Sequence, residues 1–265
     1  MSEKLTIYPP ADFDGLRGAG RLAAEVLDAI TPFVRAGVST GELDARIERF
    51  IRDKGAIPAC IGYRGYKHAS CISANHVICH GIPSDAKLLA DGDIINIDVT
   101  IILGGWYGDT SRMYYVGRPG LLARRLVETT YRAMMAGIRA CRPGGTLGDV
   151  GHAIQSVAEA ERFSVVTDFC GHGIGRVFHG APNVLHYGVP GTGAELVPGL
   201  VFTIEPMINA GVPDAVILPD GWTAVTKDRK LSAQFEHMVG ITSSGCEVFT
   251  LSPKGFACPP YRDDA

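Results

Sequence analysis

The segment that most constrains the fold is INIDVTIILGGWYGDTSRM, residues 95–113. Residues 95–102 and 106–116 are rich in isoleucine, valine, threonine and tyrosine, the composition of β-strands. Leu103-Gly104-Gly105 stands between these two runs, and glycine readily adopts the positive φ angles that tight hairpin turns require. The segment therefore predicts an antiparallel β-hairpin of two long strands.

Two aspartates, Asp98 and Asp109, interrupt this otherwise apolar hairpin. If the two-residue loop is Leu103-Gly104, the two aspartates pair directly. If the loop is Gly104-Gly105, Asp98 faces Ser111 and lies diagonal to Asp109. Both registers place the two carboxylates on one face, because side chains alternate along a strand. Since neighbouring carboxylates repel each other, the alternatives are a proton held by one of them, a cation between them or a solvated sheet face.

Apolar residues at helical spacing predict helices over residues 14–35, from a capping box at Ser39 and Glu42 to Gly55, over 121–140 and over about 147–160. Residues 164–250 have mostly the pattern of strands and turns. Helix, glycine turn, helix and strands thus occur twice in the same order. This repeat predicts two related halves whose helices cover one side of a shared, curved sheet.

Composition narrows the class of protein. No linker-like tract separates the two halves, which predicts one domain over residues 1–265, with loosely ordered ends at 1–10 and 253–265. A net charge of −3 without a cluster of lysine or arginine argues against nucleic acid or an anionic membrane as a partner. The chain has no apolar signal core or membrane-spanning run, and its cysteines lack CxxC spacing. We therefore expect a cytoplasmic protein with reduced thiols.

Three further segments place ionisable side chains in strand-like surroundings: FCGHGIGRVFH with His172, GLVFTIEPM with Glu205, and LSAQFEHMVGIT with Glu236. Glu205 shares a strand face with Thr203, where a carboxylate is costly unless it is paired or bound to metal. Singly, His172 is as readily a structural residue as a ligand, and either glutamate is more often an ion-pair partner. Together with the two aspartates, they form an oxygen-rich set with one imidazole. Such a set suits a pair of divalent ions such as Mn, Fe, Co or Zn, which is typical of hydrolases.

Six motifs carry a resemblance to a known family: CHGIP (79–83), GDIINIDVT (92–100), GDTSRM (108–113), CGHGIGRVFH (170–179), FTIEPM (202–207) and SAQFEH (232–237). In this order they resemble the type I methionine aminopeptidases of the pita-bread metallopeptidase superfamily, over roughly residues 5–252. The resemblance implies an α+β fold of two pseudo-symmetric halves, with helices outside a curved, mostly antiparallel sheet. It also implies an enzyme that removes the N-terminal methionine of nascent polypeptides when the second residue is small and uncharged. A monomer is the default expectation for the oligomeric state. A transient contact with the ribosome is among the expected interactions.

The resemblance also implies a role for each ionisable residue of the set. Asp98 matches a ligand of one metal ion, and Asp109 matches a ligand that bridges both ions. His172 and Glu205 match ligands of the other ion, and Glu236 matches the second bridging carboxylate. The predicted cofactor is therefore a pair of divalent cations, of which the sequence does not fix the element.

Three residues match groups that act on the substrate. His80 matches a histidine that contacts the substrate near the scissile amide, and His179 matches one that helps to stabilise the tetrahedral intermediate. Glu205 also matches the carboxylate that carries a proton from water to the leaving amine. Soft sulfur atoms and aromatic rings suit a thioether side chain. The residues that match the wall of the methionine pocket are Cys60, Tyr63, Tyr66, Cys71, Phe178 and Trp222.

The sequence departs from the family pattern at three places. Lys67-His68 stands where the family usually has Pro-Lys, at the rim of the pocket. His76 replaces an acidic or amide residue, and Met238 stands where threonine is frequent, near the bridging glutamate. Two alternative functions remain: an Xaa-Pro aminopeptidase or dipeptidase of the same fold, and a homologue that binds without catalysis.

Overall fold

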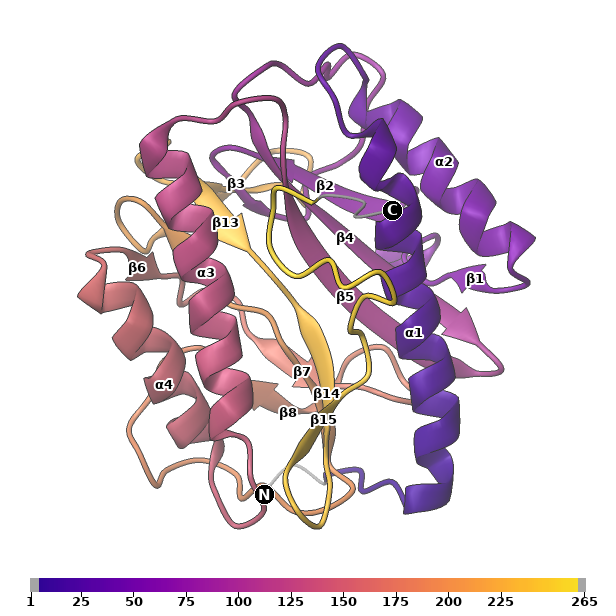
Figure 1. Ribbon diagram of the computed structural model, residues 1–265, viewed down its shortest axis with the longest axis vertical. Coiled ribbons are helices and arrows are strands. Elements are labelled where there is room, and N and C mark those ends of the chain that lie inside the picture. The colour runs from indigo at the N-terminus through magenta and orange to yellow at the C-terminus, as the bar shows by residue number, and fades with distance from the viewer. Residues whose placement is uncertain (1–4, 262–265) are drawn as a thin grey trace.

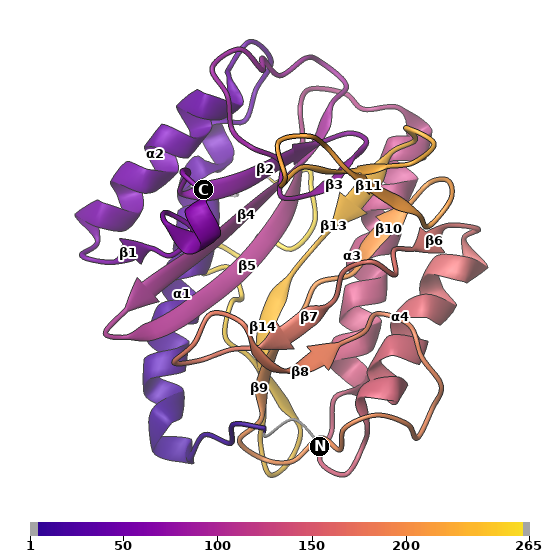
Figure 2. The same ribbon diagram turned by 180° about the vertical axis from the view of Figure 1, so that it is seen from behind.

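Two pairs of helices lie on one side of a set of antiparallel strands in the computed structural model, which describes residues 5–261 (Figure 1). The helices are α1 Phe13–Ile30, α2 Thr40–Asp53, α3 Leu121–Ala140 and α4 Leu147–Ala160, with short 3₁₀ turns at Pro10–Asp12, Thr31–Phe33 and Tyr63–Gly65. The strands are β1 Ile57–Pro58, β2 Ser70–Ala74, β3 Val77–Cys79, β4 Ile94–Leu103, β5 Trp106–Tyr115, β6 Ser164–Val165, β7 Gly171–Gly173, β8 Gly180–Val184, β9 Val201–Ile204, β10 Met207–Asn209, β11 Ala215–Ile217, β12 Ala224–Thr226, β13 Ser232–Gln234, β14 His237–Ile241 and β15 Cys246–Val248. Seen from behind, the strands lie in front of the helices (Figure 2).

The helix predictions hold for α3 and α4, and the limits of α1 and α2 need correction. The prediction of a helix to residue 35 is wrong in its last turns: α1 ends at Ile30, and a 3₁₀ turn follows. Pro32 explains the break, because it has no N–H to donate to the carbonyl four residues before it. At the start of α2, Ser39 Oγ accepts from the backbone N–H of Glu42 at 3.0 Å. The Glu42 carboxylate accepts from Arg46 instead of completing the capping box.

The hairpin of β4 and β5 adopts the second of the two predicted registers. Leu103 pairs with Trp106, which leaves Gly104-Gly105 as the loop, and both glycines have positive φ (58° and 78°). Asp98 therefore faces Ser111. Both aspartates point to the same face of the sheet, because an even number of residues separates their pairing positions.

The expected shared sheet is divided into separate hydrogen-bonded sheets, all of them antiparallel among the described residues. One sheet contains β1, β4, β2 and β5, and another has the order β15-β14-β9-β7-β8. Strand structure is interrupted at Glu205-Pro206, between β9 and β10, and at Phe235-Glu236, between β13 and β14. Pro206 cannot donate to a ladder, which accounts for the first break. A bridge between Ser111 and Glu236 joins the two larger sheets at the second.

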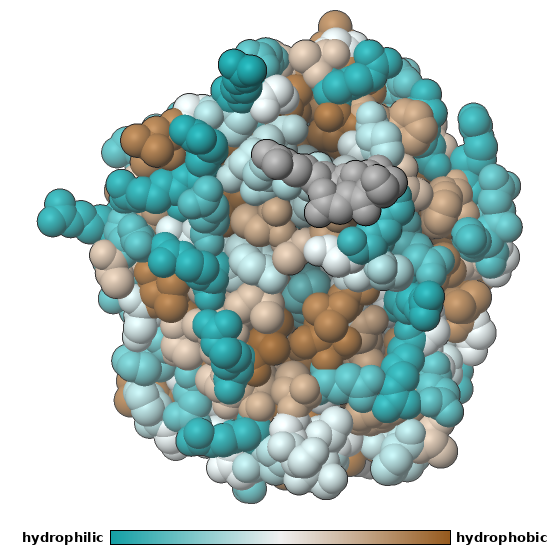
Figure 3. All heavy atoms as spheres, viewed as in Figure 1, coloured by the Kyte–Doolittle hydropathy of each residue, from teal (hydrophilic) through white to brown (hydrophobic). Residues whose placement is uncertain are grey.

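Each helix pair covers its own apolar core. Leu16 of α1 and Ile97 of β4 belong to a buried cluster under α1 and α2. Leu126 of α3 and Phe202 of β9 belong to a second cluster under α3 and α4. The outer, solvent-facing side of these helices carries hydrophilic side chains interspersed with smaller apolar groups (Figure 3). This arrangement agrees with two halves, each built from a helix pair and the strands beneath it.

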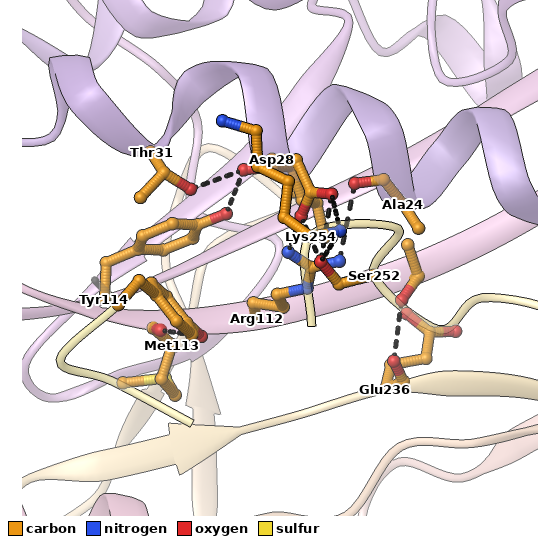
Figure 4. A network of polar contacts seen from close by, with 12 residues as sticks. Ala24, Asp28, Thr31, Arg112, Met113, Tyr114, Glu236, Ser252 and Lys254 are labelled. Atoms are coloured by element: carbon orange, nitrogen blue, oxygen red, sulfur yellow. Dashed lines mark hydrogen bonds and ion pairs between the residues drawn. The ribbon is translucent and has the colours of Figure 1, made fainter. Parts of the chain in front are cut away.

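A buried ion pair ties α1 to β5 and to the segment after β15 (Figure 4). Arg112 on β5 donates to Asp28 on α1, and both side chains are almost fully buried. Ser252 Oγ donates to Asp28 Oδ1 at 2.7 Å, and the backbone N–H of Lys254 donates to Oδ2 at 3.4 Å. The carboxylate thus holds the C-terminal segment, which runs between α1 and α3 in Figure 1.

The two ends of the chain also contact the domain where they are described. The backbone N–H of Tyr8 donates to Gly199 O at 2.8 Å, and the ring of Tyr8 is buried. Tyr261 donates its hydroxyl proton to Met113 O at 2.8 Å. The loose order expected for residues 1–10 and 253–265 stays a prediction, and positions 1–4 and 262–265 lie outside the described residues. No described helix is long and apolar enough to cross a membrane.

Candidate metal centre and active site

The fold brings all five predicted metal ligands to one cleft of about 660 Å³. Asp98 lies on β4, Asp109 on β5 and His172 on β7. Glu205 directly follows β9, and Glu236 directly precedes β14, so both glutamates occupy the breaks in strand pairing. A residue at such a break can direct its side chain away from the sheet and into a cleft.

Three of the five residues form a compact donor group. One donor atom each from Asp109, His172 and Glu236 lie within 4.8 Å of one another. Glu205 adjoins this group, because its Oε1 lies 3.6 Å from His172 Nε2, the same distance that separates Nε2 from Asp109 Oδ2. Asp98 lines the same cleft, one cross-strand diagonal from Asp109. The four carboxylates and the one imidazole therefore line the same cleft.

Asp109 and Glu236 are buried, Asp98 and Glu205 are half-buried, and these surroundings disfavour the ionised form of each carboxyl group. Burial raises the pKa of Asp98 to about 7 and that of Glu205 to about 8. Burial, followed by the negative charge of the neighbouring carboxylates, raises the pKa of Asp109 and of Glu236 well above the usual range. Four such groups can all be ionised only when positive charge lies among them. Oxygen donors with a single imidazole are a ligand set that divalent Mn, Fe, Co and Zn accept, so the residues fit metal ions.

His172 is in the protonation state that a ligand needs. Burial lowers the pKa of His172 to about 4, which keeps the imidazole neutral near pH 7. Its Nδ1 lies 3.2 Å from the carbonyl oxygen of Gly173, so Nδ1–H donates there and Nε2 is left with a free lone pair. Nε2 is also the atom that faces Asp109 and Glu205.

Two threonine hydroxyls form hydrogen bonds with candidate metal ligands. Thr203 Oγ1 accepts from the backbone N–H of His172 at 3.0 Å and donates to Glu205 Oε1 at 2.7 Å. Thr100 Oγ1 donates to Asp109 Oδ1 at 2.8 Å. Neither threonine was predicted from the sequence to have a role at the site. A signal was present, because Thr203 stands two residues before Glu205 and so shares its strand face.

Two further hydrogen bonds orient Glu205, and neither was predicted from the sequence. Its backbone N–H donates to His186 Nε2 at 3.1 Å, and Gln234 Nε2 donates to its Oε2 at 3.4 Å. Burial lowers the pKa of His186 to about 3, so the ring is a neutral acceptor. His186 compensates for the break in the strand, since the N–H of Glu205 has no ladder partner there.

The two predicted substrate histidines, His80 and His179, line the same cleft. The ring of His179 lies 4.2 Å from the ring of His172 and stacks on Phe178 at 4.1 Å, measured between centroids. The ring of His80 contacts Trp222 edge-on at 6.1 Å. Burial, with positive neighbours second, lowers the pKa of His179 to about 3, and burial also lowers the pKa of His80. Both rings are neutral near pH 7 and can donate a hydrogen bond.

The predicted methionine-pocket residues also lie together. Cys60, Tyr66 and Cys71 form a buried cluster, against which Phe178 and Trp222 pack. The ring of Tyr63 lies 4.8 Å from that of Phe178. All six line the cleft next to the candidate metal ligands.

The three departures from the family pattern have defined surroundings. His68 Nδ1 lies 3.2 Å from Asp44 Oδ2. His76 is half-buried, and its Nε2 accepts from Arg229 at 3.1 Å. Met238 is fully buried, and its backbone N–H donates to Thr250 Oγ1 at 3.1 Å. Lys67 is exposed.

Comparison with known proteins identifies the family. The model of metallopeptidase family M24 matches residues 14–243. A methionine aminopeptidase from Rickettsia prowazekii is 55% identical over 97% of this chain and 99% of its own length. The Escherichia coli K12 methionine aminopeptidase is 53% identical over 93% of this chain and 94% of its own length.

Solved structures confirm the α+β pita-bread fold. The crystal structure of the Rickettsia prowazekii enzyme superposes with a TM-score of 0.92 at 55% identity, over 94% of this chain and all of that one. The prolidase from Pyrococcus furiosus shares the fold at a TM-score of 0.75 and 22% identity, over 92% of this chain and 65% of that one. The chain described here therefore belongs to metallopeptidase family M24 and, within it, to the methionine aminopeptidases.

Proposed function

We propose that this protein is a dimetal hydrolase that removes the N-terminal, initiator methionine from nascent proteins when the second residue is small and uncharged. One observation carries the proposal: four buried or half-buried carboxylates and a neutral imidazole line one cleft beside a pocket of sulfur and aromatic side chains. The kinship with methionine aminopeptidases supports the same reaction.

The donor set would hold two divalent cations. Asp98 would hold one cation, His172 and Glu205 the other, and Asp109 and Glu236 would bridge the pair. Once bound, such a pair supplies Lewis acidity, which polarises the scissile carbonyl and lowers the pKa of a coordinated water to about 7. Co, Mn, Fe and Zn all accept these ligands.

The chain's own residues supply the remaining parts of the reaction. Glu205 accepts a proton from the attacking water and passes it to the amine of the departing peptide, a role that its place in the cleft beside His172 allows. His179 and His80, both neutral, donate hydrogen bonds to the peptide around the scissile bond. A donor aimed at the oxygen that becomes negative stabilises the transition state.

The pocket selects the first residue of the substrate. Cys60 and Cys71 place sulfur atoms, and Tyr66 and Trp222 place aromatic faces, around a volume that suits an unbranched thioether. We further propose a single catalytic domain that acts as a monomer in the cytoplasm, with transient contact to the ribosome.

Peptide hydrolysis after reconstitution tests the proposal. The metal-free protein is loaded anaerobically with Co, Mn, Fe or Zn, and methionine release is measured from Met-Ala-Ser and Met-Lys-Ser. We expect release from the first peptide and little from the second. The absence of release from Met-Ala-Ser with every metal would reject the proposal. Preferential cleavage of Xaa-Pro peptides would favour the alternative enzyme, and failure to bind any metal would favour a binding homologue.

A further inference from the structure

A buried carboxylate on an outer helix is directed at the wall of the methionine pocket. Asp44 belongs to α2, and its exposed fraction is 6%. Its Oδ1 accepts from the backbone N–H of Ser70 at 2.9 Å and from Ser70 Oγ at 2.7 Å. Its Oδ2 accepts from His68 Nδ1 at 3.2 Å. All three bonds end on the short segment 68–70, which leads into β2.

This segment is continuous with the pocket and with the metal centre. Ser70 begins β2 and pairs with Val99, and the next residue, Cys71, pairs with Asp98. The hydroxyl of Tyr66 donates to Ser70 O at 2.9 Å. A displacement of Ser70 would therefore move two pocket residues, Cys71 through the backbone and Tyr66 through its hydroxyl.

The rim loop before Ser70 keeps its shape through its own bonds. Gly62 N–H donates to Tyr66 O at 2.8 Å, and Tyr66 N–H donates to Tyr63 O at 2.9 Å. The ring of Tyr66 contacts Trp222 edge-on at 4.9 Å across the pocket. Because these hydrogen bonds lie within the loop, they fix its shape but not its position. Its position over the pocket depends on the hydrogen bonds at its two ends. Asp44 supplies those at the C-terminal end.

Stability alone does not account for a carboxylate at this position. Burial raises the pKa of Asp44, which shows that its ionised form is held there at a cost. Buried ion pairs often contribute less to stability than apolar residues of similar size. Asp44 accepts three directional hydrogen bonds, and these fix segment 68–70 in one orientation.

We propose that Asp44 is a positioning residue for the methionine pocket, which sets substrate affinity by fixing segment 68–70 and thereby Tyr66 and Cys71. The inference rests on the proposed function, because it assigns that pocket to methionine. It also gives His68, one of the departures from the family pattern, a role in holding the rim.

Four variants test this role in the metal-loaded protein. Asp44→Leu removes the acceptors and keeps the branched shape of the side chain, and Asp44→Asn keeps an acceptor for Ser70 and a polar partner for His68. His68→Ala removes only the outer bond. Asp53→Leu is the matched control, since it removes an exposed carboxylate from the same helix. For each variant we would measure kcat and KM on Met-Ala-Ser, the Kd for L-methionine by calorimetry, metal content and the melting temperature.

We expect Asp44→Leu to raise KM and the Kd for methionine about tenfold, the equivalent of one hydrogen bond to a charged group. We expect kcat and metal content to stay within about twofold of the wild type, a span of about 0.4 kcal/mol. Asp44→Asn and Asp53→Leu should resemble the wild type. Loss of metal content and kcat in parallel, or an unchanged KM and Kd, would overturn the inference.

If Asp44→Leu does not fold, His68→Ala decides: a KM about threefold higher supports the inference, and an unchanged KM overturns it. The calorimetric measurement separates this inference from the proposed function. A wild-type protein that cleaves no methionyl peptide, yet binds methionine more tightly than Asp44→Leu, would refute the function and support the positioning role. A wild-type protein that binds no methionine would overturn the positioning role.

Discussion

The hydroxyl of Thr203 donates to Glu205 Oε1 at 2.7 Å and is held in that orientation by the backbone N–H of His172, which it accepts at 3.0 Å. One side chain thereby connects candidate ligands on two neighbouring strands. Outer contacts of this kind orient metal ligands, and their loss typically weakens metal binding about 10- to 100-fold.

We predict that Thr203→Val, which keeps the shape and removes the hydroxyl, weakens metal binding at the site by about tenfold or more and lowers kcat. Thr203→Ser should retain both, because it restores the hydroxyl. Calorimetric titration of the metal-free protein with Mn measures the affinity directly. Equal affinities for the valine and serine variants would show that the hydroxyl has no such role.

We predict that His179→Ala lowers kcat about 100-fold while the metal content stays that of the wild type. The reason is that His179 lies beside the donor group, stacked on Phe178, without belonging to that group. Elemental analysis and steady-state kinetics on the same preparation check both parts. A variant that loses metal would instead make His179 a ligand.

The buried pair of Asp28 and Arg112 gives a prediction about stability. Asp28→Ala should reduce the free energy of unfolding by about 3–5 kcal/mol, because it leaves the Arg112 guanidinium buried without a counter-charge. Urea denaturation followed by circular dichroism measures this change. Asp14→Ala is the control, since the Asp14 side chain is 87% exposed and its pair with Arg17 should contribute less than about 1 kcal/mol. Similar losses in both variants would contradict the argument.

The start of α4 gives a pH-dependent prediction. Asp149 accepts from the backbone N–H groups of Thr146 and Gly191 at 2.8 Å and 2.9 Å, and these bonds lower its pKa. A carboxyl whose pKa is lower in the folded state stabilises the fold above its unfolded pKa and loses this effect as the pH falls through the folded value. Asp149→Ala should therefore melt below the wild type near neutral pH, and the difference should shrink on acidification. A difference that is constant from about pH 7 to about pH 3 would refute the assignment.

The hairpin could be predicted because it depends on a local pattern, whereas the grouping of the five candidate ligands was implied by the resemblance to the family. Strand alternation places Asp98 and Asp109 on one face in either register, so their proximity did not depend on which loop formed. The loop is Gly104-Gly105, and both glycines have positive φ. The sequence permits these backbone angles but does not require them, so the loop could not be chosen in advance. Pro32 indicates that α1 ends early, and the prediction of a helix over residues 14–35 did not take this proline into account.

The supporting contacts could not be predicted, because they join positions far apart in the chain. His186 reaches Glu205 across 19 residues, and Asp44 reaches Ser70 across 26. Neither residue stands in a motif, and an aspartate within an amphipathic helix is ordinarily solvent-facing. Only the packing of α2 against β2 and the path of the chain after β8 bring these atoms together.

The break at Phe235-Glu236 and its bridge to Ser111 have a consequence for how activity arises. Asp98 and Asp109 come from the first half of the chain, whereas His172, Glu205 and Glu236 come from the second. Neither half carries a complete donor set, however well it folds alone. Activity therefore requires the two halves to be packed against each other. A substitution that separates them would abolish turnover even if all five candidate ligands were unchanged.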